Sequence, residues 1–145
     1  MTRSTHHAIA MMAHLLLGIL LALSALTPAQ AQEPGNVLIG IYHVAPGKHL
    51  DFLRWQAARD AAGTEAGASA TQWYVHTDGD SWDFISIAPE STPQMDEKVQ
   101  AILQRKGLTT GFKASLEFRT LISSHTDTFA RGPTTAAALL EAGTK

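Results

Sequence analysis

Residues 36–44, NVLIGIYHV, form a run that is apolar at nearly every position. Ile39 and Ile41 share one of its two alternating faces, and Leu38 and Tyr42 share the other. Apolar residues on both faces are typical of a strand that is buried on both sides. The run therefore predicts the central strand of a sheet, with other parts of the protein covering both faces of that sheet.

A helix is expected directly after this strand. The turn APGKH leads to residues 48–63, where apolar side chains recur at helical spacing until Gly63 provides a stop. Phe52 and Trp55 form a second apolar ridge beside the main stripe. The main stripe, which we expect to be buried, consists of Leu50, Leu53, Ala57, Ala58 and Ala61.

A β-hairpin is expected next, with strands at 71–77 and 81–88 around Asp78-Gly79-Asp80. Asp-Gly between alternating strands is a strong hairpin signal, and it explains Asp78 by turn geometry. A two-residue turn at Asp78-Gly79 or at Gly79-Asp80 gives the same two faces. One face carries Trp73, Val75, Trp82 and Phe84, and the other carries Tyr74, His76, Asp83, Ile85 and Ile87.

The remaining segments predict a helix, a strand and a tail. Ser91-Thr92-Pro93 is typical of a helix start, with Ser91 in a capping box or Thr92 as the cap, and Gly107 of its end. Residues 115–123, SLEFRTLIS, alternate as a strand. The tail at 131–143 predicts a short helix capped by Thr134 or Thr135, which is also a candidate clamp on a partner subunit.

The expected order is β-α-β-β-α-β, the ferredoxin-like arrangement of an α+β protein with an antiparallel sheet. We expect a signal peptide at 1–31, one ferredoxin-like domain at 32–130 and a C-terminal extension at 131–145. Two main helices cover only one face of such a sheet. The second apolar face predicts that two sheets pair in a homodimer whose interior holds a ligand.

Residues 1–31 have the features of a secretory signal peptide. Arg3 precedes the apolar run at 15–26, which is too short to span the roughly 30 Å hydrocarbon core of a membrane. Ala29-Gln30-Ala31 fits the small-x-small rule for cleavage. We expect a mature chain that begins at Gln32, lies in the periplasm or is secreted, and has no membrane attachment after cleavage.

Composition narrows the classes of function. Removing the leader, which contains Arg3 and no acidic residue, changes the formal charge from −2 to −3. This acidity argues against a nucleic-acid partner. The chain has no cysteine, which excludes disulfides, thiolate catalysis and cysteine-ligated metals.

The sequence Val44-Ala45-Pro46-Gly47-Lys48 follows the buried strand and leads to Phe52 and Leu53. This junction resembles the strand-PGK-helix junction of the dimeric α/β-barrel superfamily, which includes antibiotic-biosynthesis-monooxygenase-like and stress-responsive proteins. The resemblance covers residues 36–123. It implies a homodimer whose two sheets close into a barrel, with a pocket between sheet and helices in each subunit.

Members of that superfamily include cofactor-free quinone-forming monooxygenases, haem-degrading enzymes, lactone isomerases and proteins of unknown role. The export leader is a departure from most members and argues against cytosolic NAD(P)H-linked chemistry. No haem-ligating histidine or catalytic set of any subfamily matches this sequence residue by residue.

The mature chain has four histidines, and neutral imidazole suits copper, zinc or iron. No HxH, HxxxH or HExxH spacing occurs among His43, His49, His76 and His125, so each metal ligand would come from a different element. His49 lies early in the predicted helix and is not expected in a site. The expected cofactor is therefore either none or a single metal bound by histidine and carboxylate.

Two histidine–carboxylate pairs are candidate catalytic groups. His76 and Asp83 share a hairpin face and are directly opposed if the turn is Gly79-Asp80, which suits a general base, although a plain cross-strand polar pair is the simpler interpretation. His125 and Asp127 lie in a polar segment, 123–133, which we expect to be a loop at the pocket mouth. In a structural role, Asp127 would instead satisfy the backbone of a bend and pair with Arg131.

The expected ligand-binding residues are Tyr42, His43, Trp55, Tyr74 and Arg131.

Three functions are compatible with these patterns. The first is an exported dimer that binds a small, partly apolar molecule between sheet and helices. The second is a cofactor-free or metal-assisted enzyme of the monooxygenase or isomerase type, with His125 or His76 as base or ligand. The third is a dimeric interaction module without a ligand.

Overall fold

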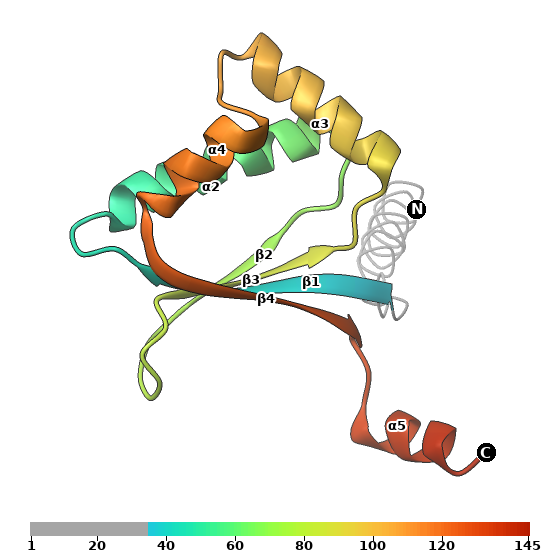
Figure 1. The fold of residues 1–145 in the computed structure, drawn as a ribbon. Coiled ribbons are helices and arrows are strands. Elements are labelled where there is room, and N and C mark those ends of the chain that lie inside the picture. Colours follow the sequence, from blue (N-terminus) through green and yellow to red (C-terminus); the bar gives the residue numbers. More distant parts are fainter. Residues whose placement is uncertain (1–34) are drawn as a thin grey trace, which may run out of the picture. The chain divides into compact units, whose positions relative to one another are not determined.

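The computed structural model describes residues 35–145, which belong to one compact unit, Glu33–Lys145. The expected signal peptide, its cleavage site and Gln32 lie outside the described residues. The elements are β1 (Gly35–Val44), α2 (His49–Ala66), β2 (Gln72–Val75), β3 (Phe84–Pro89), α3 (Pro93–Arg105), α4 (Gly111–Arg119), β4 (Ile122–Gly132) and α5 (Ala136–Gly143). Figure 1 shows α2, α3 and α4 on one side of a curved sheet.

The four strands are antiparallel neighbours in the order β2-β3-β1-β4. β1 lies in the centre, between β3 and β4, as its apolar sequence predicts. This strand order, combined with helices between β1 and β2 and between β3 and β4, is the split βαβ arrangement. The ferredoxin-like α+β fold is therefore confirmed.

Helix α2 differs from its prediction at its end and in its buried stripe. It continues past Gly63 to Ala66 and ends at Gly67, whose φ of 88° is the left-handed conformation that a helix terminus favours. Phe52, on the second ridge, is completely buried, whereas Leu50 and Leu53 are 65% and 39% exposed. The predicted main stripe is therefore wrong, because the aromatic ridge is the side that packs on the sheet.

The hairpin confirms the predicted faces and has the second of the two predicted turns, Gly79-Asp80. Val75 pairs with Phe84, and the N–H of His76 donates to the carbonyl of Asp83 at 3.0 Å, which centres the turn on Gly79 and Asp80. Both strands are shorter than expected. The Asp78 carboxylate accepts from the N–H of Gly79 at 2.9 Å, in the turn role that the sequence gives it.

Helix α3 begins and ends where the sequence predicts. The Thr92 hydroxyl accepts from the N–H of Met95 at 3.2 Å, so Thr92 is the cap and Pro93 the first helical residue. The chain leaves the helix through Gly107, which has a φ of 71°. The terminal helix α5 is likewise capped by Thr135, which accepts from Ala138 at 3.2 Å.

The prediction of a strand at 115–123 is wrong. These residues belong mostly to α4, and the last strand is β4, which contains the segment expected to be a loop. In α4 the half-buried residues Ala114 and Phe118 are spaced as on one helical face, a pattern that strand-like alternation at 116–122 obscures. β4 is an edge strand with exposed side chains on both faces, so it carries no apolar alternation.

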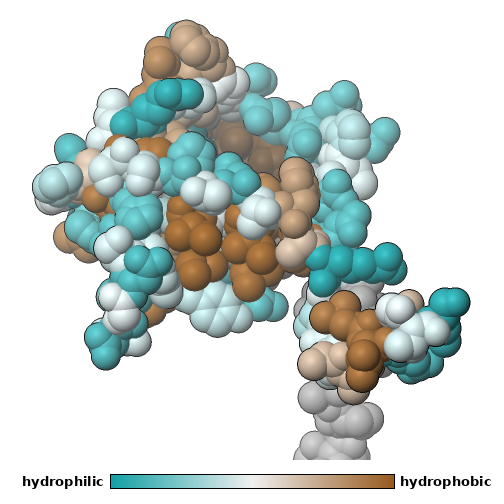
Figure 2. Space-filling view, turned by 60° about the horizontal axis from the view of Figure 1, so that its bottom comes forward, coloured by the Kyte–Doolittle hydropathy of each residue, from teal (hydrophilic) through white to brown (hydrophobic). Residues whose placement is uncertain are grey.

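The two faces of the sheet have different surroundings. On the helix side, Val44, Phe52 and Leu121 form a buried cluster to which Tyr42, Trp73 and other aromatic residues pack. On the opposite side, Ile39 pairs with Ile87 and Ile41 with Ile85. Figure 2 shows apolar side chains gathered on the side of the sheet that faces away from α2 and α3.

Within residues 35–145, no helix is both long and apolar enough to cross a membrane.

Candidate functional site between the helices and the sheet

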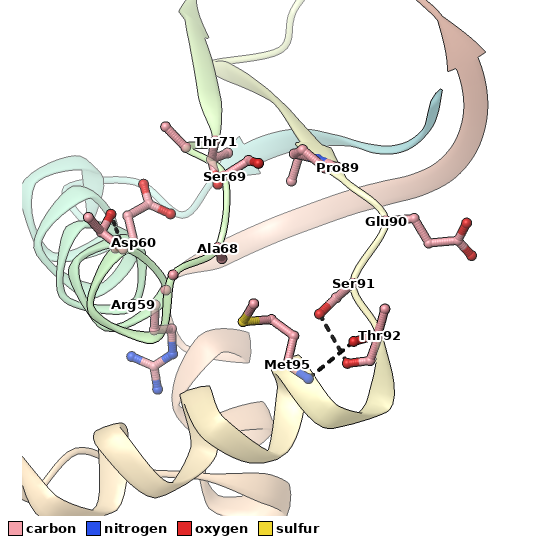
Figure 3. A pocket seen from close by; sticks show the side chains of 15 residues that line it. Arg59, Asp60, Ala68, Ser69, Thr71, Pro89, Glu90, Ser91, Thr92 and Met95 are labelled. Atoms are coloured by element: carbon pink, nitrogen blue, oxygen red, sulfur yellow. Dashed lines mark hydrogen bonds between the residues drawn. The ribbon is translucent and has the colours of Figure 1, made fainter. Parts of the chain in front are cut away.

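A cavity of about 420 Å³ lies between the C-terminal half of α2, the segment leading to β2, the end of β3 and the start of α3 (Figure 3). It combines small side chains and hydroxyl groups with few charges. Its lining consists of Arg59, Asp60, Gly63, Thr64, Gly67, Ala68, Ser69, Ala70, Thr71, Ala88, Pro89, Glu90, Ser91, Thr92 and Met95.

Local sequence explains why space remains here. After Gly67 ends α2, the chain passes through Ala68, Ser69 and Ala70, which have no long side chain to fill the gap. On the other side, Met95 extends from the first turn of α3 into the space between that helix and α2 (Figure 3). Alanine, proline and methionine make the wall apolar, whereas serine and threonine add hydroxyl groups that fix orientation.

Asp60 is the acidic group on the α2 wall of this cavity. Its Oδ2 accepts a hydrogen bond of 2.8 Å from the indole N–H of Trp73 on β2. The bond joins helix to sheet across 13 residues and fixes the carboxylate in place. The spacing of Asp60 and Trp73 in the sequence does not predict this contact, because the contact depends on how α2 lies across β2.

The sheet beneath α2 carries an aromatic group centred on Tyr42. Its ring lies 5.2 Å from Phe52, 5.8 Å from Trp73, 6.2 Å from Phe118 and 6.4 Å from His125, between ring centres. The Tyr42 hydroxyl is 3.1 Å from the hydroxyl of the buried Ser86 on β3. A predicted ligand-binding residue thus lies on the helix side, at the centre of the aromatic cluster.

The pKa of the Tyr42 phenol is raised above its ordinary value. Burial is the main cause, since it disfavours the phenolate. The Ser86 hydrogen bond opposes the shift, and the negative charges of Asp127 and Asp60 increase it. Two carboxylates therefore act on this phenol from β4 and from α2.

His125 and Asp127 lie in the middle of β4 rather than in a loop, which corrects the sequence expectation. His125 pairs with Tyr42 and Asp127 with Gly40, so both side chains share the helix side of the sheet. His125 Nε2 is 3.4 Å from Asp127 Oδ2, and the His125 ring meets Phe118 edge-on at 5.2 Å. The pair is half-exposed and lies next to the Tyr42 ring.

His76 and Asp83 are opposed in register, but their side chains do not form the expected pair. The Asp83 carboxylate accepts from the N–H of Val44 at 2.7 Å and lies 3.1 Å from His49 Nε2. Burial alone would raise the pKa of Asp83, but these two hydrogen bonds and the charges of His49 and His43 lower it. His49, which the sequence did not indicate as a site residue, is therefore the partner that ties the hairpin to α2.

The His76 ring packs on Trp82 at 5.1 Å, and within residues 35–145 its buried Nε2 has no hydrogen-bond partner. His76 therefore lies outside the aromatic group centred on Tyr42.

The other predicted ligand-binding residues are dispersed. His43 Nδ1 lies 3.1 Å from the carbonyl of Ser81, and Tyr74 is 50% exposed on the open sheet face. Trp55 lies under the guanidinium of Arg59 at 3.3 Å, near Phe118. Arg131 is exposed near the end of β4, opposite Asn36. The structure thus brings together Tyr42, His125 and Asp127, and Trp55 packs against the same buried cluster as Tyr42. The remaining predicted residues lie elsewhere, and the cavity lining includes none of the predicted site residues.

Within residues 35–145, no three histidine, aspartate or glutamate side chains are grouped closely enough to hold a metal ion.

Neither the scan against protein-family models nor the search of curated proteins gave a match. Matching solved structures include a mutant of SnoaB, a cofactor-independent oxygenase from Streptomyces nogalater, with 14% identity and a TM-score of 0.47. They also include protein Atu4242 from Agrobacterium tumefaciens (12%, 0.47) and an uncharacterized NIPSNAP domain protein from Burkholderia xenovorans (14%, 0.45). The matches cover 70% of this chain and 95%, 95% and 96% of those chains, respectively. By its own strand order, the chain has the ferredoxin-like α+β fold expected from its resemblance to the dimeric α/β-barrel superfamily.

Proposed function

We propose that the mature protein is an exported homodimer that binds a small, partly apolar molecule in the cavity between α2, α3 and the sheet. The observation that carries this proposal is the cavity itself. Its volume of about 420 Å³ lies within the roughly 300–1,000 Å³ typical of small-molecule sites. Its apolar walls and scattered hydroxyl groups match the usual composition of such sites.

The open face of the sheet supports the homodimer. Ile39, Ile41, Ile85 and Ile87 form paired positions on the side that α2, α3 and α4 leave uncovered. Contiguous apolar surface of this kind marks an interaction site. A second copy offers the same surface, and a two-fold interface requires such self-complementarity.

Export is supported by the leader sequence at 1–31. The proposal places the mature protein, beginning at Gln32, in the periplasm or outside the cell. The mass of the protein recovered from a periplasmic extract tests this part, since a retained leader would add the mass of 31 residues.

Native mass spectrometry with elemental analysis tests ligand and dimer together, on full-length protein expressed with its leader and purified without a tag or chelator. We expect a dimer that carries an extra small-molecule mass. Ala68→Phe should abolish the extra mass by filling the cavity, whereas Ala57→Phe, on the exposed side of α2, should retain it. Equal retention by both variants would contradict the cavity as the site.

A second candidate function, an enzyme of the monooxygenase or isomerase type, is favoured by one observation. His125 is 3.4 Å from Asp127 and lies against Tyr42, and a carboxylate beside an imidazole fixes its tautomer for proton transfer. An enzyme would change the released ligand on incubation in air, in mass for oxygenation or in retention time for isomerisation. A His125→Gln variant that binds the ligand but leaves it unchanged would support this role, and unaltered conversion would contradict it.

A further inference from the structure

The protein holds the carboxylate of Asp60 in position through one of its two oxygens. Within residues 35–145, its one hydrogen bond is the 2.8 Å bond from the Trp73 indole to Oδ2. No bond to the other oxygen, Oδ1, is formed within these residues, and Asp60 lines the cavity. Figure 3 shows the Asp60 side chain on the side of α2 that faces the segment of Ser69 and Thr71.

Arg59, the residue before Asp60 in the chain, directs its guanidinium away from Asp60. The Arg59 guanidinium lies 3.3 Å from the centre of the Trp55 ring and donates to the carbonyl and hydroxyl of Thr109, at 3.1 and 3.2 Å. Figure 3 places the Arg59 and Asp60 side chains on opposite sides of the helix. Arg59 therefore does not form an ion pair with Asp60 and leaves its charge uncompensated.

The other lining residues add no positive charge. Among the lining residues in the described part of the chain, Glu90 is the one charged residue besides Arg59 and Asp60. Its carboxylate accepts from the side chain of Asn36 at 2.8 Å and points away from the cavity (Figure 3). Because the Arg59 guanidinium points away from Asp60, the charge that Asp60 brings to this partly enclosed space is negative, and it attracts ligands of the opposite sign.

We propose that Asp60 selects a ligand that carries a protonated amine, which donates to Oδ1 while the apolar part of the molecule lies against the alanine, proline and methionine walls. The inference deepens the proposed function of this cavity and depends on it. A carboxylate-bearing ligand would meet the charge of Asp60 without a cation to balance it, so the site should reject anions.

Isothermal titration calorimetry with three probes of the same shape tests the inference: 2-phenylethylamine, 2-phenylethanol and phenylacetate. The protein is the mature dimer, in its native form and as Asp60→Asn. The asparagine in this variant is close in shape to aspartate and still accepts from Trp73 through its amide oxygen. Asp78→Asn, at the tip of the hairpin, makes the same change in net charge away from the cavity, and Asp60→Glu preserves the charge at the site.

The native protein should bind the amine about tenfold more tightly than the alcohol, as a hydrogen bond to a charged group implies, and should bind phenylacetate most weakly. Asp60→Asn should abolish the preference while the affinity for the alcohol stays within about twofold, and Asp78→Asn and Asp60→Glu should both keep the preference. Thermal unfolding of each variant establishes that it is folded.

Equal binding of amine and alcohol by the native protein would overturn the amine inference and leave the cavity as a ligand site. A preference that survives in Asp60→Asn, or disappears equally in Asp78→Asn, would overturn the role of Asp60. Failure of all three probes to bind would overturn the proposed binding function and the inference with it.

Discussion

The phenol oxygen of Tyr42 lies 3.1 Å from the hydroxyl of Ser86, across the boundary between β1 and β3. Tyr42 reaches this position by lying over Gly40, two residues earlier on the same face of β1. A Cβ at Gly40 would be 2.2 Å from the Tyr42 hydroxyl and 2.9 Å from that of Ser86. The missing side chain at Gly40 therefore creates the place that the phenol occupies.

Gly40→Ala should destabilise the protein by about 1–3 kcal/mol, because the added methyl group displaces a packed aromatic ring. Gly63→Ala is the matched control. Gly63 lies within α2, where a Cβ would meet Ala68 at an ordinary 3.8 Å, so alanine should stabilise by about 0.5–1 kcal/mol. Urea unfolding monitored by circular dichroism measures both. Equal effects of the two substitutions would contradict the close approach at Gly40.

The phenol of Tyr42 should ionise above its ordinary pKa of 10.0, because it is buried and lies near Asp127 and Asp60. The chain contains only two tyrosines, so Tyr74→Phe isolates the Tyr42 signal in an ultraviolet absorbance titration. Asp127→Asn in the same background should lower the pKa of Tyr42 by removing one negative charge. An ionisation midpoint at or below 10.0 in a folded sample would contradict this account.

Asp83→Asn should cost about 1 kcal/mol near neutral pH, because neutral hydrogen bonds replace charged ones to Val44 and His49. The folded-state pKa of Asp83 is lowered, so its contribution is present above its ordinary value of 3.8 and is lost as the pH falls through the lower folded value. Urea unfolding across acidic pH should show the native protein and the variant converging. Asp78→Asn, in the exposed turn, should have little effect, and a gap that persists at low pH would contradict the link to Asp83 ionisation.

Ile85→Asp should convert the proposed dimer to a monomer, because it places a charge at the centre of the open apolar face, opposite Ile41. Ser115→Asp makes the same change in charge on the exposed side of α4 and should leave the dimer intact. Size-exclusion chromatography with light scattering gives the masses, and circular dichroism verifies the fold. An Ile85→Asp protein that remains dimeric would locate the interface elsewhere.

Features that depend on local chemistry were predictable from the sequence. Thr92 followed by Pro93 indicated the start of α3. Asp78-Gly79-Asp80 indicated the hairpin and left two turns open, of which the structure has Gly79-Asp80. The apolar run of β1 indicated a central strand, because residues 37–44 are all half-buried or buried between the two neighbouring strands. Edge strand β4 was not predicted, since its exposed side chains need no apolar pattern, and half-exposed α4 shows alternation that imitates a strand.

The sequence by itself determined the order of most elements, two candidate residues for each of the caps of α3 and α5, the position of the hairpin and the candidates Tyr42, His125 and Asp127. Only the tertiary structure decided which polar groups meet. Asp83 binds His49 rather than His76, and Asp60 binds Trp73 on the wall of a cavity, because the crossing of α2 over the sheet sets these distances. Local propensity acts over a few residues, whereas such contacts depend on the packing of elements that are distant in the chain.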